Sequence, residues 1–243
     1  KYVTPLSSKP DYTEQVIWLP NSYFCFYPPE NGPAISETPA LKKNIITFGC
    51  FNKASKITPE TMEMWSKILR RVPYSKMLFK GDDYVQGREE SMKEAFNYLG
   101  IDKNRLLFQG RSKRNELLAA YADVDIALDT SPYPGVTTTC EASWMGVPTV
   151  TKEGDNFLTR GGATIAANSG RPELCASNEA DYISKAIALA QNVEHLNHLR
   201  LNSRARLSKQ PLFNAKQFSK DFAELMTSIA AKTEFKEASN EIV

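Results

Sequence analysis

The sequence is poor in several features that would narrow its function. Its four cysteines, in a chain of 243 residues, lie far apart and form no CxxC pair, which argues against a disulfide framework or zinc site and favours a reducing compartment. No G-x-G-x-x-G motif is present, so an ordinary dinucleotide site is not indicated. No apolar run approaches a membrane span, and the first residues do not form a signal peptide. The cysteines are Cys25, Cys50, Cys140 and Cys175.

Charge of either sign is not in excess. Thirty Lys and Arg face 28 Asp and Glu, for a net charge of +2, and 42% of the residues are hydrophobic. This is the composition of a globular protein without the basic footprint of a nucleic-acid binder. We expect a cytoplasmic protein with no nucleic-acid and no membrane partner.

Short apolar runs alternate with helical patterns along most of the chain. Such alternation predicts βαβ units, hence an α/β fold with a Rossmann-like, doubly wound parallel sheet. In one helix Thr58 is the expected N-cap, with Pro59 at the first position. The expected strands are 44–51, 75–81, 105–110, 125–128 and 147–152, and the expected helices are 57–72, 87–100, 112–124, 137–146, 159–170, 178–192 and 214–232.

Three regions follow from this pattern. Residues 1–44 are rich in proline and aromatic residues and predict an irregular connecting segment. Residues 45–231 form the expected Rossmann-like domain, and 232–243 a flexible tail. The chain begins with Lys1 rather than Met, and we expect it to be a fragment of a longer protein.

The stretch "DTSPYPGVTTTCEASWMG" (129–146) contains three consecutive threonines where a helix should begin. Ligands of parallel sheets bind beyond the carboxyl ends of the strands, and a helix N-terminus there attracts phosphate. The hydroxyl groups of Thr137, Thr138 and Thr139 would add donors, and Gly135 would let a phosphate approach closely. Glu141 is placed to accept hydrogen bonds from ribose hydroxyls.

A structural role for the same residues is also open. Thr138-x-x-Glu141 matches a capping box, which requires no ligand. The two interpretations can coexist, because a cap at Thr138 leaves other amide groups pointing outward.

Two further loops end at the same predicted edge of the sheet. Asn52, Lys53 and Lys56 follow the first strand, where a lysine can neutralise a diphosphate. The loop "FQGRSKRNELL" (108–118) follows the third. Taken alone, either loop could simply be solvated.

Two possible metal motifs are interpreted as structural. Asp123 and Asp125 form a DxD, but they lie between a predicted helix and the start of a strand, at the opposite edge of the sheet. His195 and His198 are three residues apart without an evident third ligand, which favours surface histidines. We therefore expect neither a metal nor another cofactor.

Three segments in combination resemble the C-terminal catalytic half of the O-GlcNAc transferase/SPINDLY glycosyltransferase family. They are "ITFGCFNKASKITPETMEMWSKILRRVP", "ADVDIALDTSPYPGVTTTCEASWMGVPTVT" and "PLFNAKQFSKDF". The resemblance implies a GT-B architecture in which this half holds a nucleotide sugar. It also implies that 1–44 joins this domain to an N-terminal catalytic half, which together with tetratricopeptide repeats binds the protein acceptor.

The resemblance further implies inverting transfer without a metal, with Lys56 stabilising the leaving diphosphate. No credible general base is present, so the fragment should bind a nucleotide without transferring the sugar. The other implied nucleotide-binding residues are Asn52, Lys53, Arg111, Ser112, Arg114, Gly135, Thr137, Thr138, Thr139 and Glu141.

The donor is left open between two branches of the family. UDP-GlcNAc is one candidate, but Leu117 stands where O-GlcNAc transferases place a histidine, and Lys53 replaces a glutamine. The motif "PYPGVTTTCE" is more similar to the SPINDLY type, whose plant members use GDP-fucose. A GT-B epimerase and a module that binds no nucleotide are the remaining alternatives.

Overall fold

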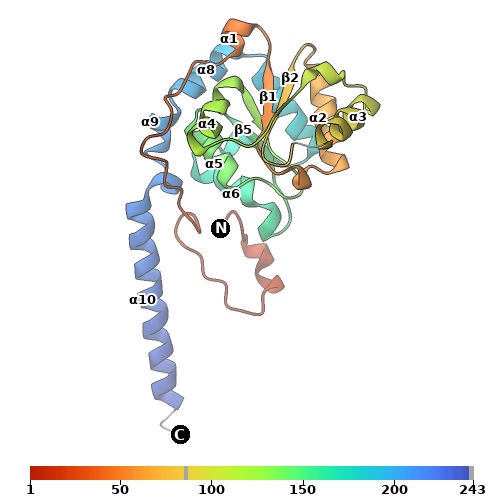
Figure 1. Cartoon of the computed structure of the whole chain (residues 1–243). Helices are drawn as coiled ribbons and strands as arrows, with labels where there is room; N and C mark the ends of the chain where they lie inside the picture. Colours follow the sequence, from red (N-terminus) through yellow and green to blue (C-terminus); the bar gives the residue numbers. More distant parts are fainter. Residues whose placement is uncertain (85–86, 241–243) are drawn as a thin grey trace.

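The computed structural model describes residues 1–84 and 87–240, with side chains through residue 231. Its centre is a six-stranded parallel sheet in the order β3-β2-β1-β4-β5-β6 (Figure 1). The chain builds outward from β1 in one direction and then returns to build from β4 in the other, which confirms the doubly wound prediction. The strands are β1 (Thr47–Cys50), β2 (Lys76–Lys80), β3 (Leu106–Gln109), β4 (Ile126–Leu128), β5 (Thr149–Lys152) and β6 (Cys175–Ala176).

Helices cover both faces of the sheet because the strands are apolar on both sides. In β2, Met77 and Phe79 join one hydrophobic cluster, whereas Leu78 between them joins another. The first cluster lies under α2 (Pro59–Arg71), α3 (Arg88–Tyr98) and α7 (Glu179–Ala190), and the second under α4 (Arg114–Ala119) and α5 (Thr137–Trp144).

The cap predicted for α2 is confirmed. The Thr58 hydroxyl accepts a hydrogen bond from the Thr61 amide at 3.2 Å, and Pro59 opens the helix. Asn178 caps α7 in the same way, through the Asp181 amide at 2.9 Å.

Several boundaries differ from the predictions. The helix expected over 112–124 is α4 followed by a separate 3-10 turn. The strand β6 was not expected, because its two residues are too few to show an alternating pattern. No helix was expected over 193–207, where α8 and α9 lie. The remaining helices are α1 (Ala40–Lys43), α6 (Gly161–Asn168), α8 (Val193–Leu201), α9 (Ser203–Leu207) and α10 (Ala215–Asn240), and the 3-10 turns are Leu6–Asp11, Ala54–Lys56, Lys103–Arg105, Ala120–Asp123, Phe157–Thr159, Pro172–Leu174 and Pro211–Phe213.

The N-terminal segment is largely irregular and packs back on the domain. It runs beside α8 and α9 in Figure 1. The Phe26 amide donates to the Leu212 carbonyl at 2.8 Å, and Phe24 and Phe26 pack against a cluster that contains Cys140 and Ile165. The origin of this segment in a missing catalytic half stays a prediction.

The long helix α10 leads away from the sheet (Figure 1). It extends to Asn240, so the backbone of most of the predicted tail is helical, and residues 241–243 lie outside the described part. In the described ranges, no helix combines the length and apolarity that crossing a membrane requires.

Candidate functional site

The loops that follow β1 and β4 meet at the carboxyl edge of the sheet, and Asn52 joins them. Its amide nitrogen donates to the Asp129 carboxylate and to the Thr130 hydroxyl, each at 3.0 Å. Its amide oxygen accepts from the Thr138 hydroxyl at 2.6 Å. The structure thus brings together two loops that the sequence placed 86 residues apart.

The threonines open α5, but they do not cap it. The helix begins at Thr137 after Val136, and no side chain caps it. Thr138 binds Asn52 instead, and the hydroxyl of Thr139 donates to the Gly135 carbonyl at 3.1 Å. The capping-box interpretation of Thr138 and Glu141 is therefore wrong.

The first turn of α5 keeps amide groups for a ligand. The Cys140 amide donates to the Val136 carbonyl at 3.1 Å, which leaves the three preceding amides without a helical acceptor. Thr137 is exposed, so its side chain lies at the surface beside these amides. Amides and helix dipole together make this turn suitable for an anion.

Glycine at position 135 is also required by the packing of the two loops. A Cβ atom at this position would lie 2.4 Å from the Thr138 hydroxyl oxygen and 2.5 Å from the Asn52 amide oxygen. The missing side chain therefore makes room for the Asn52–Thr138 hydrogen bond, and the expected role of Gly135 at a phosphate stays a prediction.

Asp129 organises the same loops and was not among the predicted residues. Its carboxylate accepts from the Gly135 amide at 2.7 Å, the Thr130 amide at 3.0 Å and the Thr151 hydroxyl at 2.9 Å. Burial raises the pKa of Asp129 to about 6, and the hydrogen bonds to it oppose this shift. The available signal was an aspartate directly after a wholly apolar strand, where a buried carboxylate needs several partners.

Lys56, in the loop that follows β1, contacts the loop that follows β4. Its ammonium donates to the Pro134 carbonyl at 2.9 Å and lies 4.0 Å from the centre of the Tyr133 ring. Burial lowers the pKa of Lys56, and the Asp129 carboxylate opposes this shift. Lys53 is exposed, and its side chain forms no hydrogen bond or ion pair with the described residues. The predicted lysine loop thus places one of its two lysines at the site.

The residues expected to contact ribose and base are only partly assembled. Glu141 is 2% exposed and pairs with the guanidinium of Arg114. Burial raises the pKa of Glu141, whereas Arg114 acts to lower it. The Arg111 side chain is 84% exposed and lies 3.9 Å from Asp82, away from this pair. The buried hydroxyl of Ser112 has no hydrogen-bond partner among the described residues.

In the first possible metal motif Asp125 has a structural role, and the histidines of the second lie at the surface. Asp125 is buried and accepts from the Ala40 amide at 2.9 Å and the Thr47 amide at 2.7 Å. His195 and His198 are exposed on α8. Among the side chains that the structure describes, over 1–84 and 87–231, no cluster of three His, Cys, Asp or Glu could hold a metal.

The sheet order and the site at its switch point are Rossmann-like, and the structural matches place the fold in the class of GT-B glycosyltransferases. The solved structure of WaaG, described as a glycosyltransferase involved in lipopolysaccharide biosynthesis, matches 76% of this chain and 48% of its own, with a TM-score of 0.54. At 15% identity this match shows the fold alone.

The family follows from the sequence comparisons. The family model described as glycosyl transferase family 41 matches residues 35–222, and the chain belongs to this family. A Petunia hybrida protein described as a probable UDP-N-acetylglucosamine–peptide N-acetylglucosaminyltransferase SPINDLY is 38% identical over 93% of this chain. That match covers 24% of the plant protein, so the chain spans about a quarter of such relatives.

A bacterial relative extends the similarity to a solved structure. The O-GlcNAc transferase of Thermobaculum terrenum, solved as a K341M mutant, is 30% identical with a TM-score of 0.86 over 93% of this chain and 43% of its own. The resemblance to the O-GlcNAc transferase/SPINDLY family is confirmed.

Proposed function

We propose that this chain is the donor-binding domain of an inverting, metal-independent protein O-glycosyltransferase that uses UDP-GlcNAc or a related nucleotide sugar. The observation that carries the proposal is the cradle at the carboxyl edge of the sheet. There the open amides of α5, the hydroxyl of Thr137 and the ammonium of Lys56 come from two different loops. They converge where a Rossmann-like sheet binds its ligand.

In this proposal the diphosphate binds the first turn of α5 and Lys56. The ammonium now bound to the Pro134 carbonyl would exchange that hydrogen bond for a phosphate oxygen. Negative charge grows on the diphosphate as the sugar leaves. A preorganised donor at such a position contributes about 3 kcal/mol to transition-state stabilisation. Lys56 would thus act on the leaving group.

The remainder of the nucleotide extends toward α4. Arg114 and Glu141 already form an ion pair, which can be rearranged to present the carboxylate to ribose hydroxyls. Ser112 offers an unpaired hydroxyl for the base, and Arg111 is free to move toward it. Lys53 supplies further positive charge at the rim.

The acceptor protein and the general base belong, in this proposal, to parts of the longer protein beyond this chain. We therefore expect the isolated chain to bind nucleotides and to transfer no sugar. We also propose a cytoplasmic location, as the free cysteines favour.

The test is calorimetric titration of the purified chain with UDP, GDP and ADP, with and without EDTA. Micromolar binding of UDP that EDTA does not change would support the proposal. Preference for GDP would instead favour the alternative donor, GDP-fucose, which Leu117 and the motif "PYPGVTTTCE" indicate. Binding of none of the three would contradict a donor site in this chain.

The Lys56→Ala variant tests the phosphate assignment. We expect it to weaken UDP or GDP binding by tenfold or more, which is ~1.4 kcal/mol or more. Lys42→Ala is the matched control, since Lys42 is exposed on α1 at the opposite edge and changes the net charge equally. Equal affinities of the two variants would show that Lys56 does not hold the diphosphate.

A further inference from the structure

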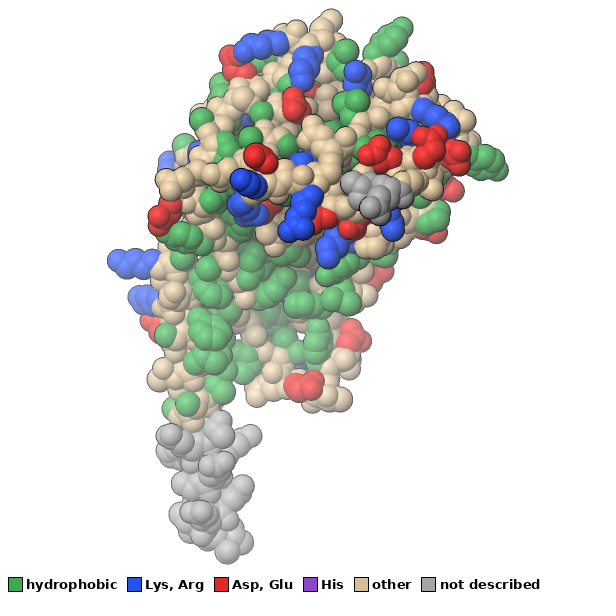
Figure 2. Space-filling model, viewed as in Figure 1, with side chains coloured by type: hydrophobic (Ala, Val, Ile, Leu, Met, Phe, Trp, Pro, Cys, Tyr) green, Lys and Arg blue, Asp and Glu red, His purple; other side chains and the backbone are tan. Residues whose placement is uncertain are grey.

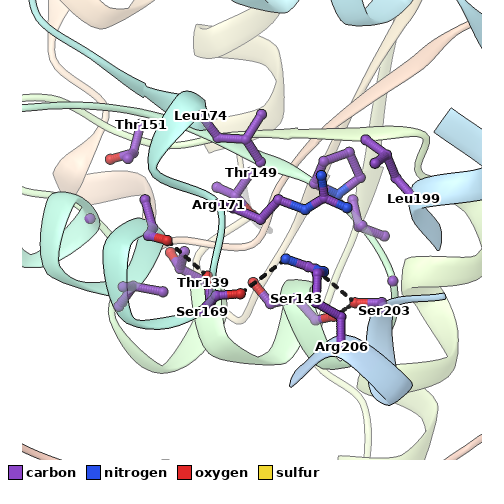
Figure 3. A pocket seen from close by; sticks show the side chains of 16 residues that line it. Thr139, Ser143, Thr149, Thr151, Ser169, Arg171, Leu174, Leu199, Ser203 and Arg206 are labelled. Atoms are coloured by element: carbon purple, nitrogen blue, oxygen red, sulfur yellow. Dashed lines mark hydrogen bonds between the residues drawn. The ribbon is translucent and has the colours of Figure 1, made fainter. Parts of the chain in front are cut away.

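A small cavity lies behind α5, enclosed by α5, β5, α6, α8 and α9 (Figure 3). Its volume is about 20 Å³. Thr139 and Ser143 of α5 form one wall, and Thr149 lies at the start of β5. Arg171 and Arg206 add two guanidinium groups to the lining, and Thr151, Ser169 and Ser203 are its other polar residues (Figure 3). The cavity is separate from the residues assigned to the donor, except for Thr139.

The lining is rich in hydrogen-bond donors and contains no carboxylate. Arg206 donates through its Nη1 to the Ser169 carbonyl at 2.9 Å and the Gly170 carbonyl at 3.3 Å. Its Nε is buried, and no acceptor faces it among the described residues. Thr149 is 8% exposed, and its buried hydroxyl likewise has no partner in the described part of the chain. Two polar groups are thus unpaired at one cavity.

The cavity is also positively charged. Arg171 pairs with the exposed Glu173 at 3.2 Å, but Arg206 forms no ion pair with any described residue. Burial lowers the pKa of Arg206 to about 10, the neighbouring charge of Arg171 lowers it further, and the Glu173 carboxylate opposes this shift. The Arg206 guanidinium is partly exposed, and the second guanidinium of Arg171 on the same cavity favours a negative charge there.

We propose that this cavity binds one small monovalent anion of the size of chloride, held by Arg206 and Thr149 with Arg171 close by. The volume decides the size, because about 10–15 Å³ is needed for one water molecule and a phosphate needs far more. The positive charge of the two arginines favours an anion over water, and a guanidinium Nε and a threonine hydroxyl can both donate to a halide.

The proposal is independent of the glycosyltransferase assignment and is tested without nucleotide. Crystals of the chain grown in sodium bromide are expected to show an anomalous peak between Arg206 and Thr149. In solution, sodium chloride is expected to raise the Tm by about 2 °C or more over sodium gluconate at equal ionic strength, as a ligand of the native state does.

Two variants assign the ligands. Thr149→Val keeps the shape of the side chain and removes the hydroxyl, and Arg171→Gln removes one charge. Each is expected to reduce the chloride effect at least by half, whereas Thr47→Val, in another buried strand position away from the cavity, leaves it unchanged. An absent bromide peak, or a chloride effect that both variants retain in full, would overturn the proposal.

Discussion

At the scale of single residues, Asp129 explains why the loops at the site hold one arrangement. Its carboxylate fixes Gly135 and Thr130 through their amides, and it accepts from Asn52, which in turn binds Thr138. The position of α5 relative to β1 therefore depends on a buried carboxylate between the two loops. Burial of that carboxylate has a consequence for pH.

The stability of the protein should fall as Asp129 ionises. The pKa of Asp129 is about 6 in the folded chain against an ordinary value of 3.8, so between these pH values the folded state holds a proton that the unfolded chain has lost. The free energy of unfolding must then decrease as pH rises through this window.

Asp129→Asn removes this dependence. The free energy of unfolding of the variant minus that of the wild type should increase by about 1–3 kcal/mol from pH 4 to pH 7. Urea unfolding at several pH values measures this difference, in which the other titrating groups cancel. A difference that is constant over the range would show that Asp129 titrates normally.

At the scale of elements, α5 is held from outside by the turn that follows α4. The buried Tyr121 donates its hydroxyl to the Thr138 carbonyl at 3.0 Å and stacks on Phe51 with ring centres 3.9 Å apart. The first turn of α5 is thus tied to β1 on one side through Asn52 and to this tyrosine on the other.

Tyr121→Phe tests this support while keeping the stacked ring. We expect it to lower the free energy of unfolding by about 1 kcal/mol, the usual contribution of one hydrogen bond. We also expect weaker UDP or GDP binding, since the amides of α5 lose their fixed position. Tyr98→Phe is the control, because Tyr98 is 92% exposed and should change neither quantity. Equal effects of the two variants would contradict the role of Tyr121.

Elements that depend on local sequence patterns can be predicted from the sequence, whereas contacts between distant residues cannot. Strand and helix order, the Thr58 cap and the meeting of the Asn52 and Thr138 loops follow from local patterns and from the geometry of parallel sheets. For Glu141 the sequence left a ribose contact and a capping box with Thr138 open, and the capping box came from spacing along the helix. The true partner of Glu141, Arg114, is 27 residues away, and only the packed structure brings the two together.

At the scale of the whole molecule, the connecting segment and the C-terminal helices form a shell around one side of the domain. The Arg204 guanidinium donates to the Pro33 carbonyl, and Asn21 donates to Asp221 of α10 at 3.2 Å. Apolar side chains gather on the lower part of the molecule in Figure 2. The exposed large hydrophobic residues include Tyr23, Phe157, Leu158, Phe222 and Met226.

Arg200 is the main link between this shell and the sheet. Its side chain is 1% exposed, and it donates to the Ser36 carbonyl at 2.9 Å, the Val124 carbonyl at 2.6 Å and the Tyr121 carbonyl at 2.8 Å. It thereby joins the connecting segment to the turn that precedes β4, the same turn that supports α5. Burial lowers the pKa of Arg200 to about 10, and the Asp125 carboxylate opposes this shift.

Arg200→Lys should therefore act on the whole molecule. A lysine keeps the charge but cannot reach three carbonyl groups in the planar arrangement of a guanidinium. Loss of the guanidinium donors to the Ser36 and Val124 carbonyls, and of one of the two donors to the Tyr121 carbonyl, should lower the free energy of unfolding by about 3 kcal/mol or more. For a domain of this size that corresponds to a Tm lower by roughly 6–12 °C. Calorimetry measures this shift, with Arg111→Lys at an exposed position as the control. If both variants melt with wild type, the shell is held by its apolar contacts, and Arg200 is not the link between them.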